Sequence, residues 1–320
     1  MTRRPIALTC GDPAGIGPEI AVAAWAELRE TVPFFWIGDP AHLPEGSPVI
    51  EIDDPSQAQA ASREAMPVLT HRFPAAATPG RPTPANAHCV ISAIERGVGL
   101  VMGGQAAALT TGPINKKALI DGADFPYPGH TEYLAALAGV DRVVMMLACP
   151  DLHVVPTTIH IPLDQVPAAL TPDLLEDTIR LTHAGLIDHF GVAKPRLAVA
   201  GLNPHAGEGG AMGHEDLSVI APVVARLAAE GLDVTGPYPA DTMFHAKARA
   251  GYDAAIAMYH DQALIPIKTI DFEGGVNVTL GLPFLRTSPD HGTAYDIAGK
   301  GIADATSLIA ALRMAADPSA

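Results

Sequence analysis

The sequence alternates short apolar runs with amphipathic helical stretches along most of its length. Short apolar runs include 5–10, 143–148 and 253–258, and the stretch 171–190 has helical periodicity after a Thr-Pro-Asp start. Apolar runs of this length bounded by Gly and Pro are typical of buried strands, and their alternation with helices predicts a mostly parallel sheet. The fold class is therefore predicted to be α/β.

Length and composition restrict what kind of protein the chain can be. With 320 residues it can form two domains of ordinary size. Its formal net charge of −15 argues against a nucleic-acid partner, which requires a basic surface. No run approaches the roughly 18 apolar residues of a membrane span, and three scattered cysteines suit a reducing compartment. We therefore expect a cytoplasmic protein without a nucleic-acid or membrane partner.

Three histidines each follow a strand-like run. His160 ends one such run, His205 lies in a Gly-rich stretch after another, and His260 follows 253–258. Ligands of open α/β sheets bind beyond the carboxyl ends of strands, and three protein ligands with an open position are typical of a catalytic metal site. An alternative is that His260 and Asp261, expected in the loop after the strand, form a hydrogen-bonded pair that only caps it. With 13 histidines in the chain, the sequence alone does not show that these three converge.

Two strand–turn–helix segments offer positions for an anion. The turn that begins at Gly11 can cradle a phosphate on helix-end N–H groups, but its spacing is not that of a Rossmann fingerprint. A second segment places Asn115 and Lys116 at a helix start, where they either hold a carboxylate or phosphate or simply face solvent. Farther along, His130 and Thr131 open a helix with Thr131 as the predicted N-cap, an arrangement that suits either an anion or ordinary capping.

Six motifs occur in one order along nearly the whole chain. They are GDPAGIGPE from Gly11, TGPINK from Thr111, GHTE from Gly129, LNPHAGEGG from Leu202, YHDQ from Tyr259 and DHGTAYDIAGKG from Asp290. Together they resemble the motifs of the 4-hydroxythreonine-4-phosphate dehydrogenase family of vitamin B6 biosynthesis, and none of them is broken.

The resemblance implies a fold and an assembly. It predicts a homodimer with the isocitrate/isopropylmalate dehydrogenase-like fold, in which two α/β domains have a cleft between them. Residues 1–128 and 266–320 would form the cofactor-side domain, and residues 129–265 the dimerisation and metal-binding domain. The active site would be shared between the subunits.

The resemblance also implies a set of site residues. A divalent metal (Zn2+, Mg2+ or Co2+) would be held by histidines of both subunits, namely His160, His205 and His260. The phosphorylated substrate would be bound by His130, Thr131, Lys268, Asn277 and Arg286. The NAD(P) cofactor would be bound by the loop 290–301, with His291, Gly292, Thr293 and Asp296. The candidate proton-transfer groups are Asp241, Asp261 and His130.

The implied reaction is oxidation of 4-phosphooxy-L-threonine at C3 by NAD(P)+, followed by decarboxylation to 3-amino-2-oxopropyl phosphate. The nearest alternative is a paralogue that oxidises 4-phospho-D-threonate or 4-phospho-D-erythronate. A three-histidine metallohydrolase and a metabolite-binding protein without catalytic activity are two further alternatives. The cofactor-like loop 290–301 argues against the hydrolase, and the ionisable groups at strand ends argue against a mere binding protein.

Overall fold

The computed structural model describes residues 4–318, which form two compact α/β units. Unit 1 comprises residues 4–141 and 282–318, and unit 2 comprises residues 142–281. Both boundaries lie later in the chain than the predicted ones. The helix that begins at His130 packs on a helix of unit 1, and the helix that begins at His260 packs on strands of unit 2, so each stays with the unit it contacts.

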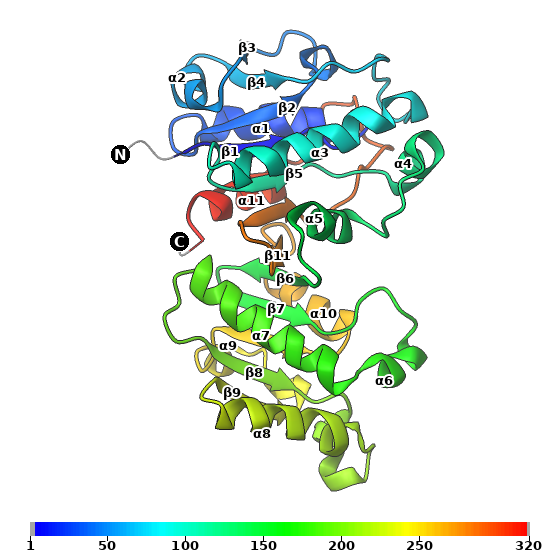
Figure 1. Ribbon diagram of the computed structural model, residues 1–320, viewed down its shortest axis with the longest axis vertical. Coiled ribbons are helices and arrows are strands. Elements are labelled where there is room, and N and C mark those ends of the chain that lie inside the picture. The colour runs from blue at the N-terminus through cyan, green and yellow to red at the C-terminus, as the bar shows by residue number, and fades with distance from the viewer. Residues whose placement is uncertain (1–3, 319–320) are drawn as a thin grey trace. The chain divides into compact units, whose positions relative to one another are not determined.

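Unit 1 contains a parallel sheet in the strand order β3-β4-β2-β1-β5-β12. Its strands are β1 (Ile6–Thr9), β2 (Phe34–Gly38), β3 (Val49–Ile52), β4 (Met66–Thr70), β5 (Leu109–Thr111) and β12 (Arg286–Pro289). Its helices are α1 (Gly17–Leu28), α2 (Ala58–Ala61), α3 (Ala87–Met102), α4 (Lys116–Ala123), α5 (His130–Ala138) and α11 (Thr306–Ala316). Figure 1 shows α3 on one face of this sheet and α1 on the other.

The turns that follow β1 and β5 lie against each other at one end of the unit 1 sheet. Strand β1 pairs with β2 on one side and with β5 on the other, so these two turns leave neighbouring strands. The turn after β1 approaches the turn after β5 closely, because Asp12 N–H donates to the carbonyl of Pro113 at 2.9 Å. Gly11 has a φ of +66°, and a Cβ there would lie 2.4 Å from the same carbonyl oxygen, so this turn requires glycine.

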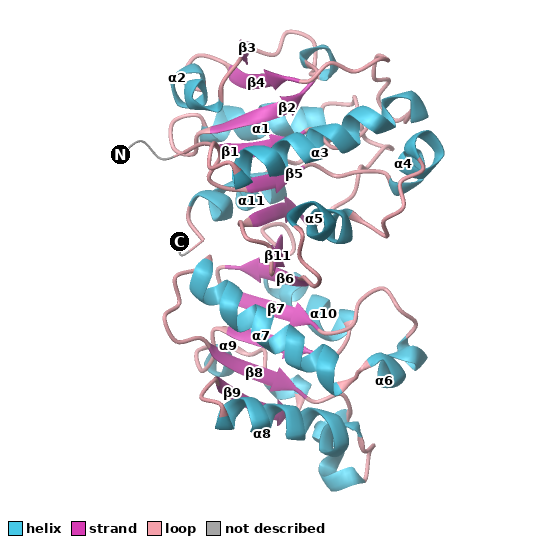
Figure 2. Cartoon of the chain, in the orientation of Figure 1, coloured by secondary structure: helices cyan, strands magenta, loops and turns pink. Residues whose placement is uncertain are grey.

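Unit 2 contains a mixed sheet in the order β11-β6-β7-β10-β8-β9. Its strands are β6 (Val144–Cys149), β7 (Leu152–Pro156), β8 (Arg196–Ala200), β9 (Asp233–Tyr238), β10 (Ala254–Ala257) and β11 (Val276–Leu280). Its helices are α6 (Val166–Ala169), α7 (Pro172–Asp188), α8 (Ala221–Ala229), α9 (Ala246–Arg249) and α10 (His260–Ile270). Strands β7, β10, β8 and β9 run parallel. Strand β6 pairs antiparallel with both β11 and β7, and Figure 2 shows the arrows of β6 and β7 pointing in opposite directions.

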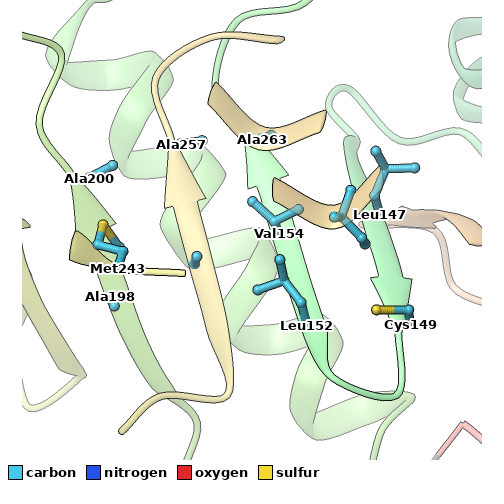
Figure 3. Packing of buried hydrophobic residues seen from close by; sticks show 11 residues of the cluster. Leu147, Cys149, Leu152, Val154, Ala198, Ala200, Met243, Ala257 and Ala263 are labelled. Carbon is cyan, nitrogen blue, oxygen red and sulfur yellow. The ribbon is translucent and has the colours of Figure 1, made fainter. Parts of the chain in front are cut away.

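The core of unit 2 is built largely from small side chains. Figure 3 shows Ala198, Ala200 and Ala257 beside Val154 and Leu152, all of them buried. Alanines on the sheet leave room for α10, which packs against β6, β7 and β10 through Ala263 and Ile267. The α/β fold class and the mostly parallel pairing predicted from the sequence are confirmed. Among residues 4–318, no helix combines the length and apolar character needed to cross a membrane.

Candidate active site

The carboxyl ends of β7, β10 and β8 lie at one edge of the unit 2 sheet, because the three strands are adjacent and parallel. Backbone hydrogen bonds extend the β7–β10 pairing beyond the strands. Thr157 N–H donates to the carbonyl of Ala257 at 2.7 Å, and the Thr158 hydroxyl donates to the carbonyl of Met258 at 2.8 Å. The segment that leads from β7 to His160 is therefore fixed against the end of β10.

His160 and His260 lie side by side at this edge. Their ring centroids are 5.7 Å apart with an interplanar angle of 43°. Both imidazoles line a cavity of about 370 Å3. Its remaining walls are mainly apolar and consist of Thr158, Ile159, Ile161, Leu163, Val166, Tyr259 and Asp261. This pair of histidines was predicted from two separate strand ends, and the structure brings the two together.

His260 and Asp261 begin helix α10 rather than a loop, which corrects the expectation from the sequence. The helix can begin directly after the strand because the Gln262 side chain forms hydrogen bonds with backbone groups at the ends of β10 and β8. Its side-chain oxygen accepts from Met258 N–H at 2.6 Å, and its amide nitrogen donates to the carbonyl of Gly201 at 2.8 Å. His260 Nδ1 lies 2.7 Å from the Asp261 carboxylate, so Nε2 is the nitrogen left to bind a ligand.

The spacing of the two imidazoles fits a shared metal ion. Nitrogen ligands roughly 2.0–2.1 Å from a tetrahedral metal place the two ring centroids about 5–6 Å apart. The carboxylate on His260 Nδ1 fixes the ring in the way that partners of metal-binding histidines commonly do. Within the described part of the chain, however, no three His, Cys, Asp or Glu residues gather closely enough to hold a metal. Of the three predicted ligands, His160 and His260 are the two that lie together in the described structure.

His205 lies in the turn Pro204–Gly210, which follows β8. His205, Ala206 and Glu208 all have positive φ angles, between 40° and 54°, a conformation that costs L-residues of order 1–3 kcal/mol each. The turn is held by the buried carboxylate of Asp216, which accepts from the backbone N–H of Leu202 at 2.8 Å. The same carboxylate accepts from the N–H and the side-chain amide of Asn203. The structure does not bring His205 into a cluster with His160 and His260.

Three other predicted residues of unit 2 lie on separate elements. Asp241 is exposed in the short helical turn Ala240–Thr242. The ammonium of Lys268, in the last turn of α10, lies 5.3 Å from the ring centroid of Phe272. Asn277 lies in β11, and its side-chain oxygen is buried without a hydrogen-bond partner among the described residues. Such an orphaned buried oxygen is a reason to expect a ligand there.

Two of the predicted substrate residues of unit 1, Arg286 and His130, lie near the carboxyl end of β5. Arg286 is buried at the start of β12 and donates to the Thr111 hydroxyl at 2.6 Å. Burial lowers the pKa of Arg286 to about 10, which still leaves the guanidinium charged at neutral pH. Burial, followed by the charges of Arg286 and Lys116, lowers the pKa of His130 well below its usual value. A neutral imidazole with a buried Nε2 thus lies near two cations.

The start of α5 differs in one detail from the prediction. Gly129, with extended backbone, is the N-cap, and the helix runs from His130, so Thr131 lies in the first turn and is not the N-cap. His130, Thr131 and Glu132 therefore occupy the first helical positions, whose N–H groups have no partner within the helix. This end of α5 carries the partial positive charge that favours an anion.

The predicted cofactor loop is anchored to the turn that follows β1. Thr293 accepts from Ile16 N–H at 3.0 Å through its carbonyl, and the Tyr295 hydroxyl donates to the Asp12 carboxylate at 2.7 Å. His291 Nδ1 donates to the carbonyl of Gly292, whereas its Nε2 is buried without a partner among residues 4–318. Gly292 and Asp296 are exposed. The loop thus combines fixed backbone with accessible positions and an unused buried nitrogen, features that suit a bound ligand.

Sequence reasoning missed the side chains that hold these groups in place. Asp216 fixes the His205 turn, Gln262 joins the ends of β10 and β8, and Thr111 accepts from Arg286. These bonds cannot be read from the sequence, because they join segments that become neighbours only in the folded sheet or require a particular side-chain rotamer. The sequence contained one indication that two of these residues matter: Gln262 lies in the motif YHDQ, and Thr111 begins the motif TGPINK.

Comparison with known proteins places the chain among well-matched relatives. The family model described as pyridoxal phosphate biosynthetic protein PdxA matches residues 30–315. The 4-hydroxythreonine-4-phosphate dehydrogenase of Roseobacter denitrificans is 63% identical over 317 residues, covering 99% of this chain and 97% of the relative. The protein of the same name from Ruegeria is also 63% identical, with 98% and 97% covered. The crystal structure of the Klebsiella pneumoniae 4-hydroxythreonine-4-phosphate dehydrogenase is similar with a TM-score of 0.89, 37% identity and 98% coverage of both chains.

We predict that Asp216→Ala loosens the turn that carries His205. The substitution leaves the backbone N–H groups of Leu202 and Asn203 without their acceptor, which should lower the free energy of unfolding by about 1–3 kcal/mol. Amide hydrogen exchange should accelerate in residues 201–210, and turnover should fall. The control is Glu208→Ala, an exposed change in the same turn, which should leave exchange at Leu202 unaltered. Unchanged exchange in Asp216→Ala would show that the carboxylate does not hold the turn.

Proposed function

Because the chain belongs to the PdxA family of pyridoxal phosphate biosynthetic proteins, we propose that it oxidises 4-phosphooxy-L-threonine at C3 with NAD(P)+ and then decarboxylates the product. As a member of this dehydrogenase family it is an oxidoreductase. Hydride leaves C3 for the nicotinamide, and the C3 hydroxyl proton passes to a base. The resulting β-keto acid loses carbon dioxide, and a proton returned to the carbanion gives 3-amino-2-oxopropyl phosphate.

The observation that carries this proposal is the paired placement of His160 and His260 on one cavity. We assign them, with His205, as ligands of a divalent metal. When bound, such a metal would polarise the C3 oxygen as a Lewis acid. The chain's own contribution is to fix the His260 ring through Asp261 and to hold the His160 segment on the end of β10. The apolar side chains of Ile159, Leu163 and Val166 line the rest of this cavity.

The contacts of the three candidate proton-transfer groups suggest a different role for each. The carboxylate of Asp261 already accepts from His260, so we assign it an orienting role. Asp241 is exposed and therefore remains the candidate for the base that takes the C3 hydroxyl proton. His130 is neutral at physiological pH because its pKa is lowered, so it can donate an N–H hydrogen bond to the phosphorylated substrate, and as a proton-transfer group it would first accept a proton.

We assign substrate binding to His130, Thr131, Lys268, Asn277 and Arg286. The charged guanidinium of Arg286, the start of α5 and the buried oxygen of Asn277 support this set. The cofactor is assigned to the loop 290–301, where His291, Gly292, Thr293 and Asp296 combine a buried nitrogen with exposed positions.

We further propose a homodimer whose subunits share the metal. Among residues 4–318, His160 and His260 are the predicted ligands that lie side by side, so His205 would be supplied by the second subunit. Most of the large apolar side chains exposed in the described residues belong to unit 2, among them Ile161 and Leu163 next to His160. A second copy of the chain would cover such a surface.

The reaction is tested by following the absorbance of NAD(P)H with three substrates side by side: 4-phosphooxy-L-threonine, 4-phospho-D-threonate and 4-phospho-D-erythronate. We predict reduction of the cofactor with the phosphorylated amino acid, loss of turnover with a strong chelator, and recovery with Zn2+, Co2+ or Mg2+. Preferential oxidation of either sugar acid would assign the chain to the paralogous activity. Full turnover in metal-free protein would overturn the metal assignment.

Subunit mixing tests how the metal ligands are shared. If His205 crosses between subunits, a dimer of one His205→Ala chain and one chain lacking both His160 and His260 has one site with all ligands intact. Mixing these two inactive proteins should restore up to one working site per mixed dimer. The control pair, His260→Ala with a chain lacking both His160 and His205, should stay inactive. Recovery in the control pair alone would mean that His260 is the ligand that crosses.

A further inference from the structure

Two consecutive lysines begin α4, and only one of them has a local structural role. Lys117 forms an ion pair with Asp121, one turn later on the same helix, at 2.7 Å. Lys116 has no acidic partner within ion-pair distance among residues 4–318. A cation in the first turn opposes the helix dipole, which favours acidic side chains there. The helix itself therefore gives no reason for a lysine at position 116.

The ammonium of Lys116 lies over the start of the neighbouring helix α5. A Cβ built on Gly129, the N-cap of α5, would lie 3.5 Å from Lys116 Nζ and 3.2 Å from a carboxylate oxygen of Glu132. Lys116 and Glu132 thus flank the cap without pairing in the described structure. A side chain at position 129 would therefore be crowded between the ammonium and the carboxylate.

Two anchors fix Lys116 in this position relative to Arg286. Asn115 caps α4 by accepting from Ala118 N–H at 2.8 Å, which sets the backbone of Lys116. Thr111, at the end of the same connection, accepts from Arg286 at 2.6 Å. One short segment between β5 and α4 therefore positions both cations. Both also act on His130, whose pKa their charges lower further after burial.

We propose that Lys116 is a further contact for the substrate's phosphate, acting with Arg286, His130 and Thr131. This inference rests on the proposed function. A phosphate monoester carries close to two negative charges at neutral pH, and Lys116 with Arg286 supplies two positive charges. The free N–H groups of α5 and a neutral imidazole add hydrogen-bond donors without a third charge. The Glu132 carboxylate, which lies near the same Cβ position, interacts favourably with the dipole at the start of α5.

The test compares Lys116→Ala with the matched control Lys117→Ala. We expect Lys116→Ala to raise the inhibition constant of inorganic phosphate and the KM for 4-phosphooxy-L-threonine by roughly ten- to hundredfold, as for loss of a charge-assisted hydrogen bond. The KM for NAD(P)+ should not change. Lys116→Arg should recover part of the affinity, because a cation is retained. Thermal unfolding of Lys116→Ala should be unchanged or slightly raised, since a cation leaves the first turn of α4.

A third variant, Arg286→Ala, distinguishes an error in the role of Lys116 from an error in the proposed phosphate site as a whole. If Arg286→Ala weakens phosphate inhibition while Lys116→Ala leaves it unchanged, the role of Lys116 is overturned and the proposed phosphate site stands. If neither variant changes phosphate inhibition, the phosphate site itself is wrong. An equal loss of phosphate affinity in Lys116→Ala and Lys117→Ala would also overturn the inference, because it would reflect the net charge of α4 and not a contact.

Discussion

The hydrogen bonds at the carboxyl end of β10 are the constraint on which the proposed metal site depends. A buried strand that ends must satisfy its last N–H and carbonyl groups. Here Thr157 and Thr158 donate to the last carbonyls of the β10 segment, and Gln262 accepts from Met258 N–H. These bonds force the chain after β7 to run beside the start of α10. His160 and His260 become neighbours because these hydrogen bonds hold the segment after β7 against the segment after β10.

Backbone strain marks the same region. His160 has a φ of 48° and His205 a φ of 54°, both in the left-handed region that non-glycine residues avoid. The buried carboxylate of Asp216 stabilises the second of these turns through three hydrogen bonds. Strain of this kind persists only where surrounding contacts determine the conformation, and it concentrates at functional sites. Two of the three predicted ligands are held in this way, whereas His260 begins an ordinary helix.

The sequence predicted the α/β class because strand–helix alternation is a local pattern. Three histidines just after apolar runs were candidates for one site, but only the family resemblance implied that they converge, and the structure brings His160 and His260 together. It misplaced the N-cap of α5, since Thr131 is a good capping residue but Gly129 leaves room for Lys116. It placed His260 in a loop, because Gln262 reaches back to the strand only in the folded chain. The part played by Asp216 is equally non-local, since its partners lie on the opposite side of the His205 turn. Contacts with a second subunit are beyond any single-chain pattern.

The central claim is that His160 and His260 of one chain bind the same metal ion. Anomalous diffraction from a crystal of the protein loaded with Zn2+ or Co2+ tests it most directly. The account predicts one anomalous peak per site, roughly 2.0–2.1 Å from a ring nitrogen of each histidine, with His205 of a second subunit as the third ligand. A fully loaded crystal in which the metal lies away from His160, or is bound by His260 of one chain and His160 of another, would contradict it.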